Sequence, residues 1–210
     1  MPIKPDSPKE KEYKVAPEGT HPARCYQIMH YGHVPNTFPG ALNPWVNTIR
    51  IVWELPDEKE VFKEGEEPRP FSIAKEFTLS MNSKSNLRKL VEQWLGKKFT
   101  DEEANDFDVE TLLGKPCLIT IEHKEGSEGR VFANVLGVTK PLGKMIMPEP
   151  VNDTKVISWN TMTKEQLDKL PDFLQKKFKS SQEFGRWVST QKLTDISYPT
   201  EQVNAEDIPF

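Results

Sequence analysis

The spacing of apolar residues changes period twice between residues 19 and 140. Residues 19–34, 45–56 and 71–82 alternate or are rich in β-branched and aromatic side chains, which is typical of strands. Residues 87–95 then repeat at the spacing of a helix face, and strand-like segments return at 116–124 and 130–140. The order of three strands, a helix and two strands limits the possible folds more than any other feature.

The helical segment carries its own start and stop signals. Its apolar face is Leu87, Leu90, Val91, Trp94 and Leu95. Ser83 is the expected N-cap and Gly96 the expected C-cap. Thr100 with Glu103 fits a capping box that opens a short second helix.

This order predicts a mainly β protein with some α. A five-stranded barrel with a helix between strands three and four is the OB-fold arrangement, which we take as the fold of residues 15–140. A β-sandwich or an SH3-like barrel is the alternative fold, because five strands and one helix are not unique to one topology.

The segments before and after residues 15–140 have a different composition from the predicted domain. Residues 1–14 are polar and predict a disordered arm, and residues 141–192 begin as a Pro/Met/Gly-rich linker. Capping-box patterns at Thr163/Gln166 and Ser180/Glu183, together with a high aromatic content, then predict a C-terminal helical appendage. Residues 193–210 are expected to form a flexible tail.

Composition excludes several classes of protein. No apolar run of about 18 residues occurs, so no membrane span is expected, and the polar N-terminus is not a secretory signal. Cys25 and Cys117 lie in strand-like runs and are interpreted as buried free thiols. We therefore expect a cytoplasmic protein, in the host bacterial cytoplasm if the chain is phage-encoded.

The net charge of −4 does not by itself exclude a nucleic-acid partner. Residues 57–67, 101–110 and 201–210 carry −4, −6 and −3, so the remainder of the chain carries +9. With the negative charge concentrated in these three acidic segments, a basic surface elsewhere on the protein is possible.

Signatures of catalysis are missing from the sequence. It contains no GxxxxGK[ST] phosphate loop and no GxGxxG, GxSxG, HExxH or CxxC motif. Cys25, His30 and His33 would lack a fourth zinc ligand and are read as residues with ordinary hydrogen bonds. We expect no catalytic residue, no metal and no cofactor.

Aromatic and basic residues are interleaved along the predicted barrel, as non-specific binding of single strands requires. Rings stack on bases and cations neutralise phosphates. About half of the rings should instead be core, and Tyr26 or Phe77 points inward or outward according to a one-residue register change. The candidate DNA-binding residues are Arg24, Tyr26, Tyr31, Trp45, Arg50, Trp53, Phe71, Lys75, Phe77, Arg88, Lys89, Lys97, Lys98, Lys124, Arg130 and Phe132.

The last seven residues, NAEDIPF, resemble the acidic C-terminal tip of bacterial single-stranded DNA-binding proteins. Glu206 and Asp207 match the acids of that tip, and Ile208, Pro209 and Phe210 match its apolar end. The resemblance implies that these five residues dock replication, recombination and repair proteins. The acid run is shorter than is usual in that family, and an aromatic segment replaces its Gly/Gln/Pro-rich linker.

A second resemblance covers about residues 15–140. The segments GTHPARC, WELP and LLGKPC are similar to those of phage-encoded single-stranded DNA-binding or recombination-associated proteins. It implies a protein, not an enzyme, that coats and protects single strands in phage replication and recombination, with homo-oligomers possible. The rival hypotheses are a protein–protein interaction module without DNA binding and a metal-dependent nuclease.

Overall fold

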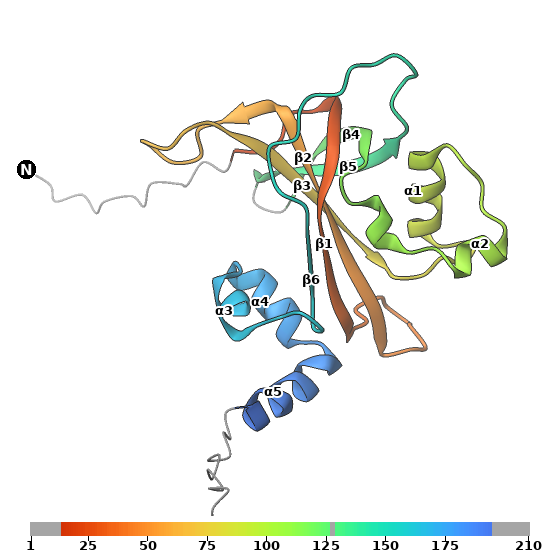
Figure 1. Cartoon of the computed structure of the whole chain (residues 1–210), viewed down its shortest axis with the longest axis vertical. Helices are drawn as coiled ribbons and strands as arrows, with labels where there is room; N and C mark the ends of the chain where they lie inside the picture. The colour runs from red at the N-terminus through yellow and green to blue at the C-terminus, as the bar shows by residue number, and fades with distance from the viewer. Residues whose placement is uncertain (1–13, 127–128, 195–210) are drawn as a thin grey trace, which may run out of the picture. The chain divides into compact units, whose positions relative to one another are not determined.

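The computed structural model describes residues 14–126 and 129–194, and within them the protein is mainly β with additional helices (Figure 1). The predicted arm at 1–14 lies almost wholly outside these residues, as does the predicted tail at 193–210. The strands are β1 (Gly19–Pro35), β2 (Trp45–Glu60), β3 (Arg69–Thr78), β4 (Pro116–Glu125), β5 (Val131–Thr139) and β6 (Lys155–Ser158).

The strands form one sheet in the order β3-β2-β1-β4-β5, with β6 paired to β1. The β2–β3, β1–β4 and β4–β5 pairs are antiparallel, and the short β6 runs parallel to β1. The predicted order of three strands, a helical insert and two strands is therefore present. Strand β6 was not predicted from the sequence, because residues 155–158 follow a Pro-rich stretch and offer only a four-residue signal.

The two outer strands of this order, β3 and β5, approach one another. The Lys75 ammonium on β3 donates a hydrogen bond of 2.7 Å to the carbonyl of Val135 on β5. The β4–β5 pairing shifts register between Thr120 and Ile121, which leaves Leu136 as an extra residue on β5. Such a bulge redirects a side chain, and Leu136 is 62% exposed.

The helical insert contains α1 (Asn86–Leu95), α2 (Asp101–Asn105) and the 3-10 turn η1 (Val109–Leu112). Helix α1 contacts β3 and β5. Ser83 was predicted as its N-cap, but the N-cap is Ser85, because the Ser85 hydroxyl accepts the Arg88 N–H at 3.1 Å. Gly96 ends the helix at φ 64°, and the Thr100–Glu103 capping box is present, both as predicted.

Contacts divide the described residues into two compact units, of which the first comprises 14–30 and 47–158. Its core fills the space between the inward faces of the strands and α1. Trp53 and Trp94 lie at its centre with ring centroids 5.8 Å apart, and the Trp94 indole N–H donates to the Pro116 carbonyl. Cys25 and Cys117 are both buried and free, as predicted, and burial raises the pKa of the Cys25 thiol to about 12.

The second unit comprises residues 31–46 and 159–194, and contains α3 (Lys164–Lys169), α4 (Asp172–Lys179) and α5 (Gln182–Thr194). The predicted capping box of α3 is present. The one predicted at Ser180 is not, because Ser180 ends α4. An aromatic cluster forms the core of this unit, with the Trp159 indole N–H donating to the Tyr31 carbonyl at 2.9 Å. Its rings are Tyr31, Trp159, Phe178, Phe184 and Trp187.

Candidate nucleic-acid interface

A groove in the first unit combines aromatic rings with cations. Its rings are Tyr26 on β1, Phe71 on β3, Phe132 on β5 and Phe62 in the β2–β3 loop. Its volume is about 710 Å³, and none of the described residues that line it is acidic. We call it the aromatic groove; its other lining residues are Lys14, Val15, Ala16, Arg50, Arg69, Pro70, Ser72, Ile73, Ala74, Ala133, Val151 and Asn152.

The rings of the groove are held at defined angles. Phe62 meets Phe71 edge-on, with centroids 5.2 Å apart and planes at 78°. The Tyr26 hydroxyl donates to the Ser72 hydroxyl at 3.2 Å. Phe132 is 54% exposed, and its ring lies so close to Gly126 that a Cβ there would come within 2.6 Å of it. The groove therefore offers an accessible ring, Phe132, beside rings that are fixed by their neighbours.

Three cations line the groove, and each is paired with a carboxylate that does not line it. Lys14 lies 2.9 Å from Glu60, Arg69 lies 3.1 Å from Glu66, and Arg50 lies 3.6 Å from Glu76. The hydrogen bond from Lys14 lowers the pKa of the Glu60 carboxyl. Ion pairs of this kind at the protein surface are weak and are screened by salt. An incoming phosphate can therefore compete for these cations at low cost.

A buried carboxylate fixes one wall of the groove. The Glu54 side chain is fully buried on β2 and pairs with Arg24 on β1 at 2.6 Å. It also accepts the backbone N–H groups of Val151 and Asn152, at 3.3 Å and 2.8 Å. Because Val151 and Asn152 line the groove, this clasp holds part of the linker predicted from Pro141 onward against the sheet.

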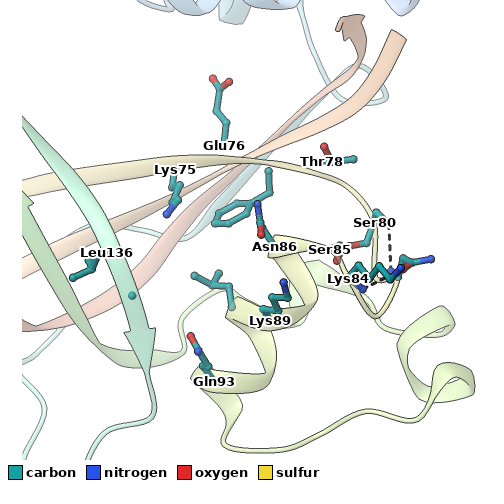
Figure 2. Close-up of a pocket in the computed structure, with 14 residues that line it drawn as sticks. Lys75, Glu76, Thr78, Ser80, Lys84, Ser85, Asn86, Lys89, Gln93 and Leu136 are labelled. Atoms are coloured by element: carbon teal, nitrogen blue, oxygen red, sulfur yellow. Dashed lines mark hydrogen bonds between the residues drawn. The ribbon is translucent and has the colours of Figure 1, made fainter. Parts of the chain in front are cut away.

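The predicted DNA-binding residues are distributed over several environments. Tyr26, Arg50, Phe71 and Phe132 come together in the aromatic groove. Lys75, Phe77 and Lys89 line a different pocket, which lies beside α1 (Figure 2). Trp45 and Arg130 line neither of these two pockets.

Four of the predicted residues are buried, and one of them, Phe77, is 6% exposed in the core of the first unit. Trp53 and Tyr31 are 0% exposed, in the cores of the first and the second unit, so neither ring can stack on a base in this structure. Arg88 is 7% exposed and is committed to Glu92 at 3.1 Å and Asp101 at 2.7 Å. The content of β-branched and aromatic residues in 45–56 predicted a strand but not which of its side chains are covered.

Four further predicted cations form ion pairs with carboxylates of the fold. Arg24 is held by Glu54 as described above. Lys97 pairs with Glu103 and Lys98 with Glu92, at 2.7 Å and 2.8 Å, around the end of α1. Lys124 pairs with Glu122 of its own strand at 2.8 Å. These contacts give the four residues structural roles that sequence reasoning did not foresee.

Sequence reasoning missed Lys14, Phe62 and Arg69. Lys14 lies at the end of the predicted disordered arm, and Phe62 lies inside an acidic loop. The signal that could have found two of them is local, since Arg69 places its guanidinium 5.6 Å from the centre of the Phe62 ring. Because β2 and β3 are paired antiparallel strands, Phe62 just after β2 and Arg69 at the start of β3 are brought together.

The described residues can be searched for metal-ligand groups and for membrane-spanning helices. Within residues 14–126 and 129–194, no group of His, Cys, Asp and Glu residues could hold a metal ion. His30 and His33 form ordinary hydrogen bonds, to Asn47 at 2.7 Å and to Glu183 at 2.8 Å. No helix in these residues is long and apolar enough to cross a membrane.

Comparison with known proteins adds no identification. No protein-family model matches the sequence, and no curated protein matches it.

Proposed function

We propose that this protein binds single-stranded DNA with little sequence preference, and that the strand lies in the aromatic groove. The observation that carries the proposal is the convergence of four rings and three cations from distant parts of the chain, with no acid among the described residues of the lining. Rings accept any base by stacking, and cations accept any phosphate. Specific reading of bases would need a denser set of directed hydrogen-bond donors and acceptors.

The fold supports the same proposal. The strand order β3-β2-β1-β4-β5, a helix between β3 and β4, and the Lys75–Val135 hydrogen bond between the outer strands together fit an OB-fold barrel. OB-folds bind oligonucleotides with the face of strands two and three, and the groove includes Arg50 of β2 and Pro70 to Ala74 of β3. We therefore propose the OB-fold as the finer description of the first unit.

The cellular role follows from the resemblances in the sequence. We propose that the protein coats and protects single strands in phage replication and recombination, and that the tip Glu206–Phe210 recruits partner proteins there. The tip lies outside the described residues. Its aromatic side chain and two acids suit an apolar pocket with a basic rim.

A titration tests the proposal directly. The full chain is titrated with dT12, dA12 and a duplex of the same length at low salt, and binding is followed by fluorescence anisotropy. We expect tight binding of both single strands, weaker binding of the duplex, and affinity that falls as salt rises. Absence of binding to any single strand at low salt would refute the proposal and favour the interaction module.

The two proposed activities are separated by a truncated chain that lacks residues 204–210. This chain should bind dT12 at least as tightly as the full chain, because the groove is intact and an acidic segment has been removed. It should lose binding to replication proteins of the host. Loss of dT12 binding on truncation would contradict the assignment of the strand to the groove.

A further inference from the structure

A second pocket in the first unit is cationic and lies between β3, α1 and β5 (Figure 2). Its volume is about 760 Å³. Lys75 reaches it from β3, Lys84 from the loop before α1, and Lys89 from the first turns of α1. We call it the basic pocket; its other lining residues are Glu76, Phe77, Thr78, Ser80, Asn82, Ser85, Asn86, Leu90, Gln93, Leu136 and Gly137.

The charges of the basic pocket are unbalanced. Within the described part of the chain, Lys84 and Lys89 form no ion pair with a carboxylate, whereas Lys75 is occupied by the Val135 carbonyl. The one acid in the lining, Glu76, extends from the opposite side of β3 in Figure 2 and pairs with Arg50 at 3.6 Å. Among the described residues, the ammonium groups of Lys84 and Lys89 therefore line this opening without an ion pair, and its acid, Glu76, is paired with Arg50.

The pocket also has an apolar floor. Phe77 and Leu90 are nearly buried, at 6% and 7% exposed, and their edges line the pocket. Leu136, which the bulge in β5 turns outward, covers the other side. An apolar floor with cations at its rim suits a nucleotide better than a free inorganic anion, because a sugar and a base need apolar contact as well as charge.

The two pockets lie at the two ends of one seam between β3 and β5. Phe71 and Phe132 line the aromatic groove, and Phe77 and Leu136 line the basic pocket. Both strands therefore run from the groove to the pocket, and the Lys75–Val135 hydrogen bond lies between them. The six residue-to-residue steps of strand from Phe71 to Phe77 span about 20 Å.

We propose that the basic pocket binds the sugar-phosphate backbone of the same DNA strand whose bases stack in the aromatic groove. This inference rests on the proposed function and deepens it, since it gives the strand a direction across the protein and a minimum length. At about 3.4 Å per nucleotide, a strand needs roughly six nucleotides to reach from one pocket to the other. Stacked at that rise, a trinucleotide covers about half of this distance and does not reach from one pocket to the other.

The test compares two double variants of the full chain. Lys84→Gln/Lys89→Gln removes the two free cations of the basic pocket, and Lys115→Gln/Lys144→Gln removes two exposed cations that line neither pocket. All four side chains are exposed, so both variants should keep the thermal midpoint of the wild type. Affinity for dT12 and for dT3 is measured as a function of salt, with NMR shift titration for the weaker trinucleotide.

We expect the slope of log K against log salt for dT12 to become shallower by about 1.4 in the Lys84/Lys89 variant, at about 0.7 per phosphate contact on a single strand. The control variant should keep the wild-type slope, and all three proteins should bind dT3 with one slope. Equal slopes for dT12 in the Lys84/Lys89 variant and the wild type would overturn the inference, as would an equal change in the control. A change with dT3 as large as that with dT12 would also overturn it, since the pocket would then bind independently of the groove. If the wild type binds no single strand, the proposed function itself fails.

Discussion

The buried carboxylate of Glu54 gives the sharpest prediction about stability. Substitution Glu54→Gln keeps the shape of the side chain but removes its charge and turns one acceptor oxygen into a donor. That group faces the Arg24 guanidinium, which is 15% exposed, and the N–H groups of Val151 and Asn152. Removing one partner of a buried ion pair costs about 3–5 kcal/mol because the other charge stays buried without compensation.

We expect a loss near the lower end of that range, about 3 kcal/mol, because Arg24 retains some contact with solvent. For a chain of this length, each kcal/mol lowers the melting temperature by about 2–4 °C, so the midpoint should fall by about 6–12 °C. Urea unfolding is followed by the fluorescence of Trp53 and Trp94, which lie in the core of the same unit.

A double-mutant cycle with Arg24→Gln isolates the interaction between the two charges. We expect a coupling energy above about 1 kcal/mol, because contacting residues in one network do not act additively. The variant in which both residues are replaced by leucine should recover much of the lost stability, since apolar replacement of a buried pair is often neutral. A loss below 1 kcal/mol in Glu54→Gln, or a coupling energy near zero, would refute the role assigned to this clasp.

Three further predictions concern the groove, the core and the helical insert. Phe132→Ala should weaken dT12 binding by about 1–3 kcal/mol with little change in stability. The control Phe38→Ala removes a ring that is 75% exposed and lies outside both pockets, and it should leave the affinity for dT12 unchanged. Equal effects of the two substitutions in an anisotropy titration would exclude Phe132 from the site. Trp53→Phe should lower the free energy of unfolding but leave the affinity of the folded protein for dT12 unaltered, and a specific loss of affinity would show that this buried ring reaches DNA after all. The hydrogen bond from Lys98 holds the pKa of Glu92 at about 2, below its usual 4.5, so its stabilising effect is complete above pH 4.5 and is lost as the pH falls toward 2. Urea unfolding from pH 2 to 6 should therefore show a difference between wild type and Glu92→Gln that shrinks with acid, and a constant difference would contradict this reasoning.

The strands were well predicted from the sequence because each strand buries one face or both. Burial imposes a regular spacing or a continuous run of apolar residues along the strand. Residues 116–124 were predicted as a strand, and Cys117, Ile119 and Ile121 all point into the core. The helix was recognised for the same reason, but its first residue was not. Ser83 was expected as the N-cap, and only the fold of the preceding loop decides that Ser85 accepts the Arg88 N–H.

The site was less predictable because it depends on which face of each strand remains uncovered. Trp53 and Arg50 lie on one strand with the same composition signal, yet one is in the core and the other lines the groove. Arg24 was expected to meet phosphate but is held by Glu54, which the sequence presents as one acid among many. Pairings of residues 30 to 130 positions apart decide these outcomes, and periodicity carries no information about them.

The sharing of strand β1 between the two units has a consequence for how the chain is assembled and cut. Trp159 bonds to Tyr31, 128 residues earlier, so the aromatic cluster closes only after most of the chain is available. Contacts of such long sequence separation form late and slow the search for the native state. The second unit is therefore not a detachable appendage. A chain ended at residue 158 would leave the buried Tyr31 ring without Phe178, and deletions meant to remove only the tail should begin after residue 194.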